Sequence, residues 1–463
     1  MISRVFPWVN WLTLSALAAV LTLVATLVAG WDRALWYDEV FTLGAAAPGR
    51  PIDWTPILND VHPPGHILLV RAASGLVGDG FALRTVNLIG LILLAAALPH
   101  YARALGRDRL ALLVLLTLCN GFALTMLIEL RAYFLLYAGA VLGHGLLLTL
   151  SAARPHTLPL FLLGAALATL HYFGAAIGMA LLNTAAALHL RAGRVRAALP
   201  VTAGIGLVVA AVLSWILFSK RRGLAAYQDF WIGNDPVALA DTLSHLPLLA
   251  LLLVLIAAFR TEPGAGQELR RHWLAALAPP AMVFATALAI SLVVPVVSYR
   301  NLIVCVPGLT LAAALACPQS LLDRLKASAL TLLVAVLVGL YLTNLATRDI
   351  QMVAWAVRTA GAPGCDGVPI HVIRPDVVDE MAQELFTPDR HRPLRDITTV
   401  DPAATMPEDC PIIAMGWHQD GTVDQLQAFF AARGMPVDIL PPPNDRLARQ
   451  GTLFPGFVVR RRQ

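Results

Sequence analysis

The sequence predicts a polytopic α-helical membrane protein with a small α/β domain at its C-terminal end. Hydrophobic residues make up 58% of the 463 residues and charged residues only 14%, about half of the charged share that is usual in soluble domains. Several apolar runs, such as WLTLSALAAVLTLVATLVAG at 11–30, approach the roughly 20 residues that a helix needs to cross a bilayer. Runs of this length exclude an outer-membrane β-barrel.

About eleven segments have the hydropathy of a membrane span, and they define an expected membrane domain over residues 1–348. The first segment is not a cleaved signal peptide, because it is long, lacks a convincing cleavage site and is followed by many other spans. A long loop, residues 30–80, follows it. The expected spans lie near 9–30, 81–100, 110–128, 132–150, 158–172, 174–190, 198–218, 241–259, 273–296, 301–317 and 329–346.

The distribution of Lys and Arg predicts the orientation of the chain. If the N-terminus is cytoplasmic, the loops on its side carry thirteen Lys and Arg and the opposite side of the membrane domain carries ten. The thirteen crowd into short loops such as RAGRVRA at 191–197, and positive charge in short loops favours the cytoplasmic side. With an odd number of spans, we expect the 30–80 loop and the C-terminal domain in the periplasm.

Residues 349–463 differ in composition and hydropathy pattern from the rest of the chain. The runs PIHVI (369–373), PIIAMGW (411–417) and GFVVRRR (456–462) are typical of strands, and TVDQLQAFFAARG (422–434) is typical of an amphipathic helix ended by Gly434. These elements predict a small soluble α/β domain. From residue 350 onward the chain holds 11 Arg against 14 acidic residues, so its charge argues against nucleic acid as a partner.

The five cysteines fall into two groups. Cys365 and Cys410 lie in the expected periplasmic domain, where an oxidising compartment permits a disulfide. Two unpaired thiols are an equal alternative. Cys119, Cys305 and Cys317 lie in apolar spans and are expected to be small buried hydrophobes.

Polar motifs gather at those ends of the apolar runs that face outward in the expected topology. Ionisable groups near a bilayer are costly, so each one raises a functional question. Chance charges would be divided between the two sides, and the convergence therefore predicts an outward-facing site. The six motifs are WYDEV (36–40), DVHPPGHILLVRAAS (60–74), ELRAYFLLYA (129–138), LHYFG (170–174), SKRRGLAAYQDFW (219–231) and SYRNLIVCVPGL (298–309).

Each motif also has a structural interpretation. The acid pair in WYDEV could cap a helix at the membrane surface. Glu129 and Arg131 could form an interfacial ion pair, and His171 could be a hydrogen-bonded core histidine. The basic run at 220–222 could contact lipid headgroups, and Arg300 could extend to the interface. Taken together, these interpretations explain the convergence less well than a shared site does.

The ordered set W-x-D-E, HPPG, E-x-R-x-Y, HYF and a late YRN…P, over about residues 8–346, resembles the bacterial family 39 branch of the GT-C membrane glycosyltransferases. This branch is related to protein O-mannosyltransferases and lipid A aminoarabinose transferases. The resemblance implies a GT-C-like membrane domain and an inverting transferase of the bacterial cell envelope. It would move a sugar from a polyprenyl-phosphate donor to a hydroxyl of a lipid, glycan or protein acceptor at the periplasmic face of the inner membrane.

The resemblance also implies roles for the acid pair. Asp38 would activate the acceptor hydroxyl, which is a poor nucleophile unless a carboxylate within hydrogen-bond reach accepts its proton. Glu39 would orient the acceptor or help to hold the donor or a divalent cation. A cation is thus possible, but no cofactor is required. We assign no metal ligands, because the sequence lacks a dense His/Asp/Glu cluster.

The leaving phosphate gains negative charge, so fixed cations in a low-dielectric site would stabilise it. Arg300 and Arg131 are the first candidates for binding the donor phosphate, and Lys220, Arg221 and Arg222 are the second. Six further residues are expected to line the substrate site. They are His62, Glu129, Tyr133, His171, Tyr172 and Tyr299.

Two other classes of protein remain open on sequence alone. A transporter or flippase of lipid-linked sugars would also have many spans, but it would place ionisable groups near the bilayer midplane and often show repeated halves. The sequence has no internal repeat of that kind. A non-catalytic assembly protein is the other alternative, and it would tolerate the loss of Asp38.

Overall fold

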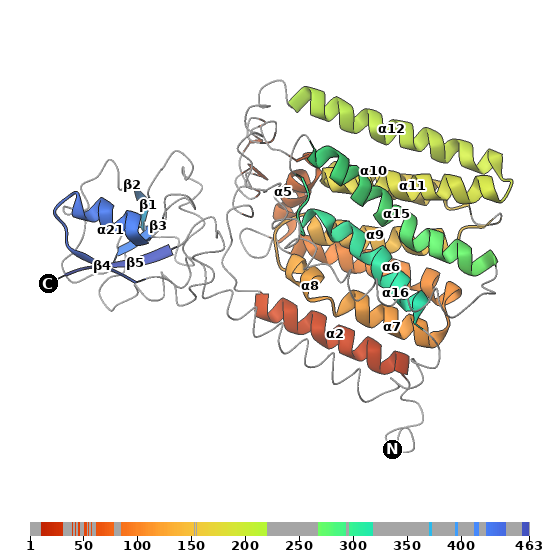
Figure 1. Cartoon of the computed structure of the whole chain (residues 1–463), viewed down its shortest axis with the longest axis horizontal. Coiled ribbons are helices and arrows are strands. Elements are labelled where there is room, and N and C mark those ends of the chain that lie inside the picture. Colours follow the sequence, from red (N-terminus) through yellow and green to blue (C-terminus); the bar gives the residue numbers. More distant parts are fainter. Residues whose placement is uncertain are drawn as a thin grey trace, which may run out of the picture. The chain divides into compact units, whose positions relative to one another are not determined.

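The computed structural model (Figure 1) falls into two compact units, which we describe in turn. One unit comprises Met1–Leu27 and Ala45–Gly339, and the other comprises Val28–Gly44 and Leu340–Gln463. The structure describes residues 11–30, 39, 42, 45–46, 51–52, 54, 57, 62–77, 85–151, 153, 155–219, 267–292, 296–317, 370–372, 394–396, 412–415, 423–440 and 456–462.

The first unit is a bundle of apolar helices. In Figure 1, α2 runs along one edge of the bundle and α12 along the opposite edge, whereas α5 and α8 lie toward one end. Nearly every residue of α9 is buried, so this helix forms the centre of the core. The elements are α2 (Trp11–Gly30), α5 (Gly65–Val77), α6 (Leu88–Ala104), α7 (Arg107–Leu118), α8 (Gly121–Leu127), α9 (Tyr133–Leu148), α10 (Thr157–Leu170), α11 (Tyr172–Arg191), α12 (Val195–Ser219), α15 (Gln267–Ser291), the 3-10 helix η4 (Asn301–Cys305) and α16 (Val306–Ala316).

Nine of the eleven expected spans coincide with these helices, and the other two, 241–259 and 329–346, lie outside the described residues. By length and hydropathy, four helices of the described part can each cross a membrane, and the bent pair α7–α8 makes five if it is one broken span. The chain is therefore a multi-pass membrane protein. The total of eleven spans stays a prediction. The four are Thr85–Ala104, Tyr172–Arg191, Val195–Leu217 and Glu268–Ser291.

The segment expected as one span over 110–128 is divided into α7 and α8, which meet at an angle of 54°. Asn120 leaves the helical conformation between them, and its side-chain oxygen accepts hydrogen bonds from the amides of Phe122 and Ala123 at 3.0 and 3.1 Å. This is an N-cap, which satisfies free N–H groups at the start of a helix. The cap explains why a new helix begins in the middle of an apolar run.

Small residues let α10 and α11 approach closely. A Cβ atom added to Gly174 would lie 2.0 Å from the carbonyl oxygen of Leu167, and one added to Gly178 would lie 2.8 Å from the Cα atom of Gly164. Small residues four positions apart are typical of tightly packed membrane helices. The junction between α10 and α11, which carries the HYF motif, is consequently held by backbone packing on both sides.

A buried histidine completes the hydrogen bonding of α15. Pro279 has no N–H group, so the carbonyl of Ala275 one turn earlier loses its helical partner. His144 of α9 donates from Nδ1 to this carbonyl at 2.8 Å. Gly308 of α16 lies against the same imidazole, because a Cβ atom at Gly308 would be 2.8 Å from its Cε1 atom. These contacts tie α9, α15 and α16 together.

The described part of the second unit contains a five-stranded sheet and a helix. The strand order is β2-β1-β3-β5-β4, with β1 parallel to β2 and β3, and with β5 antiparallel to β3 and β4. The strands are β1 (Ile370–Val372), β2 (Leu394–Asp396), β3 (Ile412–Met415), β4 (Val437–Leu440) and β5 (Gly456–Arg461), and the helix is α21 (Val423–Ala431).

The expected strands at 369–373, 411–417 and 456–462 and the expected helix are present, whereas β2 and β4 were not expected. Leu426 and Phe430 of α21 are buried, as are Val437 and Ile439 of β4. Gly434 follows the helix with a φ of +69°, a conformation that glycine adopts at little cost. The limits of the domain at 349–463 stay a prediction.

The predictions for the cysteines can be tested only in part. Cys305 and Cys317 are buried, as expected, whereas Cys119 is half-buried with its sulfur 3.8 Å from the hydroxyl of Thr22. The proposed disulfide between Cys365 and Cys410 lies outside the described residues and stays a prediction.

Candidate active site

Aromatic and basic side chains from several motifs meet at one end of the helical unit. The rings of His62 and His171 are 4.3 Å apart between centroids, and Tyr133 lies 5.4 Å from His171. The guanidinium carbon of Arg131 lies 6.0 Å from the centroid of the Tyr133 ring. The structure thus brings together residues from the motifs HPPG, E-x-R-x-Y and HYF, which are far apart in the sequence.

The HPPG motif is placed by a close backbone contact. A Cβ atom added to Gly65, the first residue of α5, would lie 2.4 Å from the carbonyl oxygen of Thr169 near the end of α10. Only glycine permits this approach. The start of α5, and His62 just before it, are therefore packed against the helix end that leads to His171.

His171 stands between two helices, with an extended backbone at φ −168° and ψ 152°. It follows the last residue of α10 and is the N-cap of α11, where its Nδ1 atom accepts a hydrogen bond from the amide of Phe173 at 3.1 Å. The side chain is 4% exposed. The alternative of a hydrogen-bonded core histidine is thus correct for one ring nitrogen.

His66, four residues after His62, joins the same group and was not predicted as a site residue. Burial, and then the positive charge of Arg131, lower the pKa of His66 from 6.5 to about 3. Burial, Arg131 and His66, in that order, lower the pKa of His171 from 6.5 to about 3. Both imidazoles are therefore neutral at physiological pH, and Arg131 supplies the positive charge next to them.

The turn that carries Glu129 and Arg131 is fixed by Asn87. The side-chain amide of Asn87 donates to the carbonyls of Met126 at 3.3 Å and Leu127 at 3.1 Å, and also to the carbonyl of Glu129. These carbonyls lie at and just beyond the end of α8, where helical partners are missing. Glu129 itself is 1% exposed.

Tyr299 and Arg300 form a second group at the start of α8. The Tyr299 ring lies 5.4 Å from the ring of Phe122, and the guanidinium carbon of Arg300 lies 5.7 Å from the Tyr299 ring. Asn301 shapes this turn, because its side chain donates to the carbonyl of Val296 at 2.8 Å. The seven residues of α8 rise about 10 Å, and this helix links the second group to Arg131.

For the remaining predicted site residues, the structure gives burial for two and does not describe the other four. Tyr172 is half-buried at the first position of α11. Glu39 is fully buried, and it belongs to the unit that contains the C-terminal sheet. Asp38, Lys220, Arg221 and Arg222 lie outside the described residues, so their roles stay predictions.

Three contributing residues were missed by the sequence reasoning: His66, Asn87 and Phe122. The spacing of His62 and His66 in HPPGH was a usable signal, because a turn followed by a helix brings residues four apart to one side. A lone Asn in the apolar run TVNLIG was a second signal, since a buried amide needs partners. Phe122 had no distinguishing signal.

Within the described part of the chain, no group of three or more His, Cys, Asp or Glu residues is arranged to hold a metal ion. Arg131 contributes positive charge to the cluster, and the imidazoles of His66 and His171 are neutral. Such a group is suited to an anionic or oxygen-rich ligand rather than to a cation.

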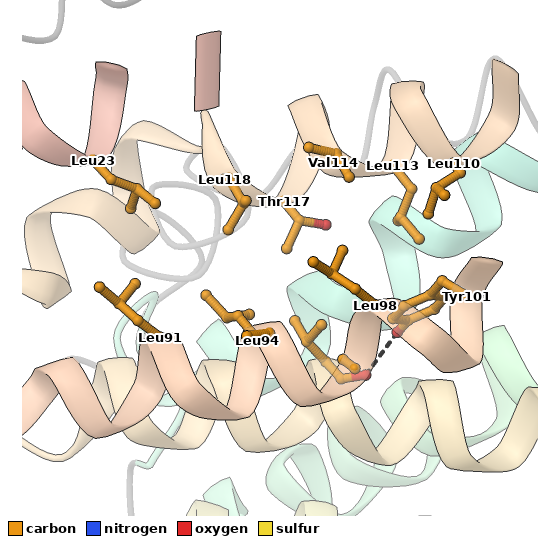
Figure 2. Close-up of a pocket in the computed structure, with 13 residues that line it drawn as sticks. Leu23, Leu91, Leu94, Leu98, Tyr101, Leu110, Leu113, Val114, Thr117 and Leu118 are labelled. Carbon is orange, nitrogen blue, oxygen red and sulfur yellow. Dashed lines mark hydrogen bonds between the residues drawn. The ribbon is translucent and has the colours of Figure 1, made fainter. Parts of the chain in front are cut away.

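A separate cavity of about 170 Å³ lies among α2, α6, α7 and α9 (Figure 2). Its walls are almost entirely leucine, alanine and valine side chains. The hydroxyl of Tyr101 at its edge donates to the carbonyl of Val141 at 2.7 Å. This lining is typical of contact with hydrocarbon, whereas the polar chemistry is at the His171 cluster.

The structure is similar to two crystal structures of ArnT from Cupriavidus metallidurans, one bound to undecaprenyl phosphate and one in the apo state. The TM-scores are 0.54 and 0.52, the sequence identities are 14% and 13%, and each match covers 96% of this chain and 97% of ArnT.

ArnT is a lipid A aminoarabinose transferase with the GT-C fold. The similarity shows that this chain has the GT-C fold, which the motifs over about residues 8–346 predicted. No protein-family model matches the chain, and no curated protein matches it.

Proposed function

We propose that the chain is an inverting glycosyltransferase of the bacterial inner membrane. It would transfer a sugar from a polyprenyl-phosphate donor to a hydroxyl of a lipid, glycan or protein acceptor at the periplasmic face. The main support is the fold shared with ArnT over 96% of the chain, because one ArnT structure holds undecaprenyl phosphate. The gathering of His62, Arg131, Tyr133 and His171 at one end of the bundle adds a site of suitable chemistry.

The reaction is a single displacement at the anomeric carbon. The acceptor oxygen forms a bond to this carbon while the bond from the carbon to the phosphate oxygen breaks, which inverts the configuration. Asp38 accepts the proton of the acceptor hydroxyl, and general-base assistance of this kind typically contributes 10²–10⁴-fold in rate, as an order of magnitude. Glu39 orients the acceptor.

The electron pair of the broken bond remains on the phosphate, which changes from a singly charged diester into a monoester of higher charge. Arg131 is suited to stabilise this charge, because it supplies a fixed positive charge among buried neutral rings, where electrostatic interactions are strong. Arg300 in the second group, together with the basic run at 220–222, would hold the diester before reaction.

The experiment that tests the function compares lipids and envelope glycans, by mass spectrometry, from cells with and without the gene. We expect one class of molecule to lose one sugar when the gene is deleted, and this sugar to return when the gene is restored. Unchanged glycans, together with an unprocessed lipid-linked sugar on the cytoplasmic face only, would instead indicate a flippase.

A further inference from the structure

The two ring nitrogens of His171 have different surroundings. Nδ1 accepts the hydrogen bond from the amide of Phe173, so it must present its lone pair and cannot carry a proton. A neutral imidazole has one N–H group, and in His171 this group is therefore at Nε2. The N-cap of α11 thus selects the tautomer.

The neutral form of this tautomer is also enforced. A second proton at Nδ1 would break the cap, and it would place a buried charge near Arg131. Burial and the charge of Arg131 lower the pKa of His171 to about 3. At physiological pH, His171 is therefore a hydrogen-bond donor that neither loses its Nε2 proton nor gains a second proton at Nδ1.

The Nε2 atom of His171 is buried and has no hydrogen-bond partner among the residues that the structure describes. The same is true of Nε2 of His66, whose ring is 6% exposed. Buried polar groups in folded proteins are nearly always paired, so an unpaired one needs an explanation. The rings of His62 and Tyr133 face His171 at 4.3 and 5.4 Å.

The missing partner has to be an acceptor, because His171 can only donate from Nε2. The positive charge of Arg131 lies close enough to act on both His66 and His171. An anionic oxygen can accept the hydrogen bond from the imidazole donor and is attracted by the charge of Arg131, whereas a cation can do neither. A phosphate oxygen has this chemistry.

We propose that His171 is a catalytic residue, whose Nε2–H donates a hydrogen bond to the phosphate oxygen that leaves the sugar, beside the guanidinium of Arg131. This inference rests on the proposed function. In the displacement, the acceptor proton goes to Asp38 and the electron pair of the broken carbon–oxygen bond goes to the phosphate. His171 keeps its own proton throughout, and its hydrogen bond strengthens as charge develops on the oxygen.

The variant His171→Asn separates this role from the helix cap. Asparagine is a good N-cap residue, so its side-chain oxygen can still accept from the amide of Phe173, and the melting temperature should stay close to that of the wild type. It lacks a donor at the position of Nε2. Loss of one donor to a developing oxyanion typically lowers the rate by about 10²–10³-fold, and we expect a reduction of about this size in sugar transfer.

Binding is measured with the full chain in lipid nanodiscs, using undecaprenyl phosphate and undecaprenol as probes. We expect His171→Asn to weaken binding of the phosphate about tenfold and to leave binding of the alcohol unchanged. Wild-type affinity for the phosphate together with wild-type turnover would overturn the role of His171 and leave the transferase intact. No binding of the phosphate by the wild type would count against the proposed function itself.

A second measurement does not depend on a variant. In ¹⁵N spectra of histidine-labelled wild-type protein, with His171→Asn used only for assignment, His171 should show protonated Nε2 and unprotonated Nδ1. It should not titrate between about pH 5 and pH 8, and its Nε2 signal should shift when undecaprenyl phosphate is added. A proton on Nδ1, or no shift at saturating phosphate, would contradict the proposal.

Discussion

His144, packed among α9, α15 and α16, and His171, at the junction of α10 and α11, are both buried, but their nitrogens are used in opposite ways. His144 donates from Nδ1 to the carbonyl that Pro279 leaves free, so its proton serves the backbone of α15. His171 accepts at Nδ1 from the start of α11, so its proton remains available at Nε2. Burial alone therefore does not separate a structural histidine from a functional one, whereas the partner of each nitrogen does.

The surroundings of the two rings also differ: His144 is packed against backbone, whereas His171 lies among polar and charged side chains. The backbone of Gly308 closes around His144, and a Cβ atom there would lie 2.9 Å from its Nε2 atom. Around His171 are other polar side chains and the charge of Arg131. We therefore expect substitutions around His144 to reduce the stability of the fold. We expect substitutions around His171 to reduce the rate of sugar transfer.

The largest expected effect concerns Asp38. The variant Asp38→Asn keeps the volume of the side chain but cannot accept the acceptor proton, and loss of a general base typically costs about 10²–10⁴-fold in rate. Donor binding should survive. The measurement is transfer of sugar from the lipid-linked donor in membrane vesicles. If Asp38 only caps a helix, asparagine would serve equally well and turnover would stay near normal.

The next effect is expected from His144→Ala. The carbonyl of Ala275 would be left without a partner, which typically costs about 1–3 kcal/mol for a buried group. Thermal unfolding of the purified protein should occur at a lower temperature, while transfer activity per folded molecule should change little. If activity were lost and the melting temperature were unchanged, His144 would have a role in catalysis. The proposed difference between a structural His144 and a functional His171 would then be wrong.

A loss of stability of similar size is expected from Gly308→Ala. The new Cβ atom would lie 2.4 Å from the carbonyl oxygen of Ala276, so α15 and α16 must separate. Overpacking of this kind typically costs about 1–3 kcal/mol. The matched control is Gly206→Ala in α12, where nothing lies within 4 Å of the added atom and alanine is the better helix former by about 1 kcal/mol. Equal melting temperatures for the two variants would contradict this account of the packing.

The last expected effect is a dependence of stability on pH at the His171 end. The pKa values of His66 and His171 are lowered from 6.5 to about 3 in the folded chain. Below pH 6.5 the unfolded chain therefore binds protons that the folded chain does not, and stability present above this pH is lost as the pH falls. Each imidazole contributes at most about 1.4 kcal/mol per pH unit. The double variant His66→Asn/His171→Asn should flatten this slope in thermal unfolding, and an unchanged slope would mean that these rings are not buried and neutral.

Much of the fold was predictable because it depends on local pattern. Nine of the expected apolar spans coincide with helices, and the polar HYF motif correctly marked the junction of α10 and α11. The break between α7 and α8 was missed, because averaging over a long window hides one residue. The dipeptide Asn120–Gly121 is a known turn signal and marked the break.

The candidate site was predictable only as a set of residue types. The motifs indicated His62, Arg131 and His171, and the structure brings these residues together with Tyr133. The structural role of His144 was out of reach, because its partner is a carbonyl 131 residues away that is exposed by Pro279. Contacts of this kind depend on how helices pack against each other, and the local sequence does not predict that packing.

The most direct test of the central claim is binding of undecaprenyl phosphate by the purified full chain in nanodiscs, with Arg131→Gln and His144→Asn as a matched pair. Arg131 contributes positive charge to the proposed site, whereas His144 is packed among α9, α15 and α16. The account predicts saturable binding by the wild type, at least tenfold weaker binding by Arg131→Gln (about 1.4 kcal/mol), and wild-type binding by folded His144→Asn. Equal binding by the wild type and Arg131→Gln, or no binding by either, would contradict it.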